Sequence, residues 1–165
     1  MAIKPGMVHD GNYRVWFVDT IANPNAPTVA EINAGLSLED QITPDGLARS
    51  ASDDTVDTSR LSSTFSTMRQ GRTGFEIALT LVRLDETVSG VVDTAYDALV
   101  KNNLGFLVVR DDRPATAALA VGQEVEVYPV ECGTRSKANA APNEQMTFTV
   151  PMVMTDNPRL NAVVA

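Results

Sequence analysis

Few residues in this sequence could perform chemistry. It contains one histidine, His9, and one cysteine, Cys132. A Ser-His-Asp triad or a histidine-rich metal site requires more histidine than this. His9 lies in a polar amino-terminal segment, and Cys132 is interpreted as a small buried thiol because only His9 could activate it. We therefore expect no catalytic group, no cofactor and no metal.

A pair of carboxylates occurs in "RDDRP", residues 110–114. Neighbouring carboxylates can bind a cation or act as acid and base. Because arginines flank this pair at the end of an apolar run, we interpret it as a charged turn. A small hydrolase that uses Asp111, Asp112 or Glu131 has no supporting constellation elsewhere in the sequence.

Composition is typical of a soluble globular protein. The 165 residues suit one domain, 1–165, of which 44% are hydrophobic and 21% charged. The net charge of −8 argues against a general nucleic-acid binder, which needs Lys and Arg to neutralise phosphates. No segment has the roughly 20 apolar residues of a membrane span, and the first residues lack the apolar run of a signal peptide. A single cysteine excludes an intrachain disulfide.

Apolar alternation predicts a mainly β fold. Strands are expected in these segments: "YRVWFV", "FEIALTLVRL", "GFLVVRD", "EVEVYPVE" and "QMTFTVPMVM". Pro129 and Pro151 predict edges or bulges, because proline cannot donate to a ladder. A helix is predicted over 91–100 with Ser89 as N-cap, and a short apolar tail over 156–165. The expected architecture is a β-sandwich or curled barrel with one flanking helix.

The stretch "APTVAEINAGLSLEDQITPDGL" carries detailed local signals without any chemistry. Thr28 and Glu31 form a capping-box pattern, which predicts one or two helical turns ending at Gly35. A strand-like alternation follows, and "TPDG" predicts a tight turn at 43–46. We interpret the stretch as a device that aims the next segment, with Thr28 and Glu31 as the cap at its start.

That next segment, about 48–74, is predicted to be a long loop. Ten residues between Ser50 and Thr67 are Ser or Thr. Residues 39–59 contain six acidic residues and one arginine, whereas residues 60–75 contain three arginines and no acidic residue. There are two interpretations of this pattern. The loop can be solvated, with charges that cancel locally, or the acidic part of the loop in one copy can contact the basic part of the loop in another copy. The residues in that contact would be Asp53, Asp54, Asp57, Arg60, Arg69 and Arg72.

Strands with two apolar faces, such as "YRVWFV", also predict burial beyond the core of one monomer. From about Tyr13 to the carboxyl terminus, the sequence resembles the tail tube protein (major tail subunit) of long-tailed, non-contractile bacteriophages. The order of the following segments carries the resemblance: "APTVAEINAGLSLEDQITPDG", "RTGFEIALTLVRL", "VVDTAYDALVKN", "GFLVVRDD", "VGQEVEVYPVECG" and "NEQMTFTVPMVMTDNP".

The resemblance implies a non-enzymatic virion protein, made and assembled in the host cytoplasm, with a β-sandwich-like domain. Copies would close into hexameric rings and stack into a hollow tube through which double-stranded DNA passes. Its partners would be itself and the tape-measure, tail terminator and tail-tip proteins, with no membrane. The 48–74 segment would join rings, and Glu76, Glu124 and Glu126 would face the lumen and repel DNA. The alternative is a non-enzymatic β-sandwich binding or decoration module of a virion.

Overall fold

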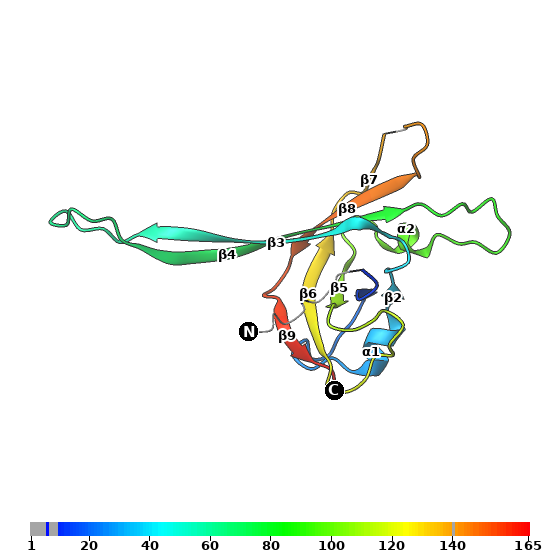
Figure 1. Cartoon of the computed structure of the whole chain (residues 1–165), viewed down its shortest axis with the longest axis horizontal. Coiled ribbons are helices and arrows are strands. Elements are labelled where there is room, and N and C mark those ends of the chain that lie inside the picture. Colours follow the sequence, from blue (N-terminus) through cyan, green and yellow to red (C-terminus); the bar gives the residue numbers. More distant parts are fainter. Residues whose placement is uncertain (1–5, 7–9, 140) are drawn as a thin grey trace.

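The computed structural model describes residue 6 and residues 10–139 and 141–165. The prediction of a mainly β fold is confirmed (Figure 1). The elements in chain order are β1 (Arg14–Val18), α1 (Val29–Ala34), β2 (Leu36–Ser37), β3 (Ile42–Asp57), β4 (Met68–Val82), α2 (Thr94–Ala98), β5 (Leu104–Arg110), β6 (Glu124–Cys132), β7 (Ser136–Lys137), β8 (Thr147–Met154) and β9 (Arg159–Val163).

The strands form one antiparallel sheet in the order β2-β1-β5-β6-β8-β4-β3. It forks at β6, which pairs with β5 along one edge and with β9 and then β8 along the other. Pro129 lies where β6 changes partner, and its carbonyl accepts from the N–H of Thr155 at 3.0 Å. Pro151 lies between the β7 and β6 pairings of β8, so each proline has a gap in the pairing along one edge of its strand and a partner along the other edge.

Two apolar clusters fill the body on opposite faces of β1, β5 and β6. The first lies between these strands and the β4–β8 part of the sheet, and includes Phe17, Leu79 and Phe148. The second lies under α1 and the carboxyl-terminal residues, and includes Trp16 and Ile32. The prediction that β1 needs burial outside the monomer is therefore wrong, because the chain itself covers both faces.

The capping box is confirmed at the start of α1. The Oγ1 of Thr28 accepts from the N–H of Glu31 at 3.2 Å, and Glu31 Oε2 accepts from the N–H of Thr28 at 2.8 Å. The other Glu31 oxygen accepts from the N–H of Ala22 at 2.9 Å, which closes the preceding turn. The cap thus fixes α1 over the second cluster. Figure 1 shows α1 at the opposite end of the body from the start of the long hairpin.

The expected helix over 91–100 is shorter, because Gly90 with a φ of +87° ends a turn just before it. α2 spans only Thr94–Ala98, and its N-cap is Asp93 rather than Ser89. The buried Asp93 carboxylate accepts from the backbone N–H of Tyr96 at 3.2 Å and lies 3.3 Å from the Nε of Arg83. A local charge network therefore sets the helix start.

The segment expected to be a loop over 48–74 is instead most of a β-hairpin, formed by β3 and β4. Only 58–67 lies between the two strands. Residues 50–74 are all exposed, so no apolar alternation marks these strands in the sequence. Thr and Val, which occur in this segment, are β-branched residues of the kind enriched in strands. The predicted tail over 156–165 likewise contains a strand, β9, and the side chain of Val164 after it is buried.

The "TPDG" stretch is a bulge inside β3 rather than a turn. β3 advances from Ile42 to Leu47 while β4 advances only from Leu81 to Leu79. The additional residues are looped out at 43–46, and such bulges bend and twist a strand. A Cβ on Gly46 would lie 2.3 Å from the carbonyl oxygen of Thr80 and 2.5 Å from Thr43 Oγ1. Only glycine fits this bend.

Substituting Gly46→Ala should therefore lower the free energy of unfolding by about 1–3 kcal/mol, because the added methyl group has backbone on one side. Urea denaturation measures the loss. Gly6→Ala is the control, since nothing lies within 4 Å of a Cβ at that position, and it should change little. Equal midpoints for Gly46→Ala and the unaltered chain would show that the bulge tolerates a side chain.

Candidate interaction surfaces

The hairpin leaves the body as a two-stranded ribbon, which we define as residues 50–74. Figure 1 shows it extending well beyond the rest of the molecule. β8 pairs with β4 only from Ile77 to Val82, so the ribbon has two unpaired strand edges. Unpaired edges can accept another strand or another chain. The ribbon is therefore a surface whose strand edges no other strand of the described residues covers.

All six residues predicted to join copies lie on the ribbon, and all are exposed: Asp53, Asp54, Asp57, Arg60, Arg69 and Arg72. The structure places the acids on β3 and two of the arginines on β4, with Val56 opposite Arg69. Asp53 accepts from the hydroxyl of Thr73 at 2.6 Å. Among the described residues, none of the six makes an ion pair within the chain, so their charges are available to a partner.

The serines and threonines of the ribbon tip, residues 58–67, hold its loop together. The Oγ of Ser59 accepts from the N–H of Thr67 at 3.1 Å, and the Oγ of Ser63 accepts from the N–H of Phe65 at 3.1 Å. The side chains of Leu61 and Phe65 are 108% and 75% exposed. The tip thus presents two apolar side chains on a loop that its own hydroxyl groups order.

A second surface is the outer face of β3, β4 and β8, which we call the open face. Ala48, Glu76 and Ala78 lie on it, and so do Thr80 and Thr149, whose hydroxyls are 3.0 Å apart. The two helices lie elsewhere, since α1 covers the second cluster and Ala95 and Leu99 belong to the first. The open face is rich in small and polar residues, with Pro151 and Val153 of β8 also exposed on it, and neither helix covers it.

The three acids predicted to face the lumen do not share one face. Glu76 is exposed on the open face. Glu124 and Glu126 lie on the opposite side of the sheet from Glu76, and they alternate along β6 with Val125 and Val127, which belong to the second cluster. Glu126 is paired with Arg49 and also accepts from the hydroxyl of Tyr128 at 2.8 Å. The charge of Glu126 is therefore neutralised within the chain. Of the three acids predicted to face the lumen, Glu76 is the acid that lies on the open face.

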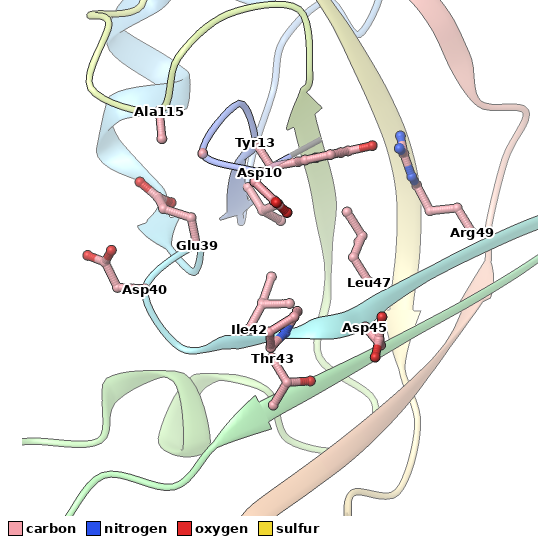
Figure 2. A pocket seen from close by; sticks show the side chains of 13 residues that line it. Asp10, Tyr13, Glu39, Asp40, Ile42, Thr43, Asp45, Leu47, Arg49 and Ala115 are labelled. Atoms are coloured by element: carbon pink, nitrogen blue, oxygen red, sulfur yellow. The ribbon is translucent and has the colours of Figure 1, made fainter. Parts of the chain in front are cut away.

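A third surface is a hollow of about 620 Å³ beside the base of the ribbon, which we call the acidic hollow (Figure 2). It is bounded by β1, the β3 bulge and the loop between β2 and β3. Apolar side chains form its floor: Val15, Ile42 and Leu47. Carboxylates surround them: Asp10, Glu39, Asp40 and Asp45. Among the described lining residues Arg49 is the one arginine, and it is already paired with Glu126, so this part of the lining is negatively charged.

Glu39 is the carboxylate of the hollow that is fixed by a hydrogen bond and an ion pair within the chain. Burial alone would raise its pKa, but the hydroxyl of Ser37 at 2.7 Å and the Nε of Arg14 at 3.0 Å outweigh that effect and lower the pKa. It is thus ionised at neutral pH. Asp10, Asp40 and Asp45 are exposed and make no ion pair with the described residues, so they remain uncompensated.

Sequence reasoning missed the role of Arg110. Its side chain is fully buried, and its guanidinium donates to the carbonyls of Pro114 and Ala117 at 2.9 and 3.0 Å. It also donates to Gln123 Oε1 at 3.1 Å. Arg110 therefore orders the loop that follows β5 from inside. The only available signal was an arginine at the end of an apolar strand.

Cys132, Asp111 and Asp112 are among the remaining sequence candidates that the structure describes. Cys132 is buried, as predicted, and His9 lies outside the described residues. Asp111 lies 3.5 Å from Arg49, and Asp112 lies 3.2 Å from Arg113. Across the described ranges, no group of three or more His, Cys, Asp or Glu side chains could hold a metal. No helix in the same ranges is long and apolar enough to cross a membrane.

The fold is similar to that of a chain in a solved structure. One chain in the cryo-EM structure of the anti-feeding prophage (AFP) baseplate, 6-fold symmetrised, is similar with a TM-score of 0.54. The identity is 10%, over 94% of this chain and 95% of that chain, so the likeness concerns the fold. No curated protein sequence matches significantly.

The family is shown by a sequence model described as phage tail tube protein, which matches residues 1–165. The chain belongs to the phage tail tube protein family, and it is a structural component of the virion. The resemblance to tail tube proteins seen in the sequence is confirmed.

The buried thiol gives a direct test of the core. Burial and the neighbouring Glu131 raise the pKa of Cys132 to about 11 from its ordinary 9.0. Since the thiolate is the reactive form, this leaves about a hundredfold less of it at pH 8. Labelling by dithiobis(nitrobenzoate) should be at least about a hundredfold slower in native buffer than in concentrated urea. Thr64→Cys, on the exposed tip, should label rapidly in native buffer, and equally fast labelling of Cys132 would contradict the packing described.

Proposed function

We propose that copies of this chain close into rings, with six as the expected number, and that the rings stack into the hollow tube of a phage tail. The observation that carries the proposal is the ribbon. Twenty-five consecutive exposed residues, 50–74, form an ordered hairpin with two free edges and unpaired charges. An isolated hairpin is marginally stable in water, so a long one that serves no internal purpose implies an external partner.

Two different kinds of contact are needed for such a tube. A ring closes when one surface of a subunit meets a different surface of its neighbour, and stacking propagates because its contacts do not close. We assign stacking to the ribbon and its six charged residues. Strand edges supply the ring contact, since β3 and β2 are the two ends of the main strand order.

We assign the open face to the lumen. Its small and hydroxylated side chains offer no site for a base or a phosphate, and Glu76 repels the DNA backbone. Glu124 and Glu126 fit this role less well, because Glu126 is occupied by Arg49. Double-stranded DNA would be passing cargo. Tape-measure, terminator and tail-tip proteins would meet the ends and interior of the tube, and no enzymatic step is involved.

The ribbon can be tested by shortening it in register. Asp53 and Thr73 are direct cross-strand partners, so an Asn-Gly turn can join them in place of residues 54–72. The body should keep its urea midpoint, because no core residue is removed, whereas negative-stain microscopy should show no tubes. Thr64→Ala is the control and should assemble normally. Tubes formed by the shortened chain would contradict the proposal, and a monomer of the unaltered chain at high concentration would favour a decoration module.

The lumen assignment can be tested by reversing one charge. Glu76→Lys should give tubes that hold short duplex DNA at low salt, because the lining attracts phosphate instead of repelling it. The measure is the amount of DNA protected from nuclease, with several-fold more expected than for unaltered tubes. Asp97→Lys makes the same charge change on exposed α2 and controls for DNA bound outside. Equal protection by both variants would place Glu76 outside the lumen.

A further inference from the structure

We propose that the ribbon tip of one copy docks in the acidic hollow of another copy. This inference rests on the proposed stacking and names the surface that receives the ribbon. The hollow combines an apolar floor with a negative rim. The tip combines exposed apolar side chains with positive charge. No other pair of surfaces described above matches in both respects.

The apolar match concerns Leu61 and Phe65. Both extend from the tip into solvent, and Met68 at the end of β4 is 65% exposed. Exposed apolar groups that lie together mark interaction sites. A hollow of about 620 Å³ lies within the roughly 300–1,000 Å³ of pockets that bury drug-sized molecules, so it has room for these two side chains. Ile42 and Leu47 would provide the apolar contact.

The charge match concerns the arginines beside the tip. Arg60 and Arg69 flank the apolar pair, and 58–75 contains no acid. Asp57, the nearest acid, ends β3 just before the tip, and its carboxylate accepts from the N–H of Ser59 at 2.7 Å. In the hollow, Asp40 and Asp45 have no ion pair among the described residues. Complementary charges of this kind steer encounter and fix register.

Geometry requires the two surfaces to belong to different copies. Leu47 lines the hollow, and Asp57 ends the strand that begins there. Ten residues of strand project the tip roughly 33 Å from the hollow of its own chain. The cross-strand pairing of β3 with β4 keeps the ribbon extended, as Figure 1 shows. A tip can therefore reach a hollow only on a neighbour.

The order of the tip favours docking as a formed unit. Hydroxyl groups of Ser59 and Ser63 accept from two backbone N–H groups of the tip, and Leu61 and Phe65 stay exposed. A surface that is ordered before binding loses little conformational entropy when it docks. The Ser and Thr content, which suggested a flexible loop in the sequence, thus prepares the contact.

Cysteine cross-linking tests this docking, because the native Cys132 is buried and does not compete. One variant carries Thr64→Cys on the tip, and a second carries Ala115→Cys on the wall of the hollow. Ala120→Cys is the control, being exposed in the same loop as Ala115 but outside the hollow. Disulfides require Cα atoms within roughly 7 Å, so only docked sites will link.

Under assembly conditions with a mild oxidant, the Thr64→Cys and Ala115→Cys proteins should form disulfide-linked dimers when mixed, and each alone should not. The Thr64→Cys and Ala120→Cys mixture should give at least tenfold fewer. Arg60→Glu on the tip partner should slow linking about tenfold, and Asp40→Arg with Asp45→Arg on the hollow partner should restore it.

Two results would overturn the docking, and they can be told apart. If tubes form but the Ala115→Cys mixture links no better than the control, the tip docks elsewhere while the proposed tube stands. If the unaltered chain forms no tubes and no mixture links, the docking and the proposed function fail together.

Discussion

The structure depends on burial of both faces of β1, β5 and β6 within one chain. Trp16 and Val18 lie under α1 on one side, and Val15 and Phe17 lie against β4 and β8 on the other. These three strands need nothing from outside to be stable, since apolar area removed from water is the main favourable term in folding. The hairpin can therefore extend into solvent without taking core residues with it.

β6 connects the buried and exposed parts of the sheet. Its backbone pairs with β5, β8 and β9, so the sheet divides there into a closed half and an open half. The prolines at 129 and 151 lie where partners change, and neither interrupts a continuous ladder. The division lets one face hold the core while the same sheet continues outward as the open face and the ribbon.

The sequence predicts those parts of the fold that local side-chain patterns determine. The alternation in "FEIALTLVRL" and the Thr28–Glu31 cap are formed as expected, because core burial and a hydrogen-bond pair decide them locally. The ribbon was predicted as a loop because strands exposed on both faces need no apolar period. The "TPDG" residues favour a turn, yet pairing with β4 on both sides holds them as a bulge.

The candidate surfaces were predictable to different degrees for a related reason. The charged residues of the ribbon were found because charge is visible in the sequence. The acidic hollow was not, since it brings residues 10, 40, 45 and 115 together only after folding. Glu126 was assigned to the lumen because its strand alternates, and its partner Arg49 lies 77 positions away along the chain. Long-range pairing of this kind has no local signal.

The ribbon is also a lever. It is held at its base by the Gly46 bulge and by the pairing of β4 with β8, and it carries the exposed side chains of Leu61 and Phe65 at the far end. With an arm of roughly 33 Å, a rotation of about 10° at the bulge moves the tip by roughly 6 Å. In the proposed tube, a small adjustment in each subunit would accumulate into curvature of the whole assembly while every contact is kept. Stiffness would then be set by the bulge at the base of the ribbon rather than by the contacts at its tip.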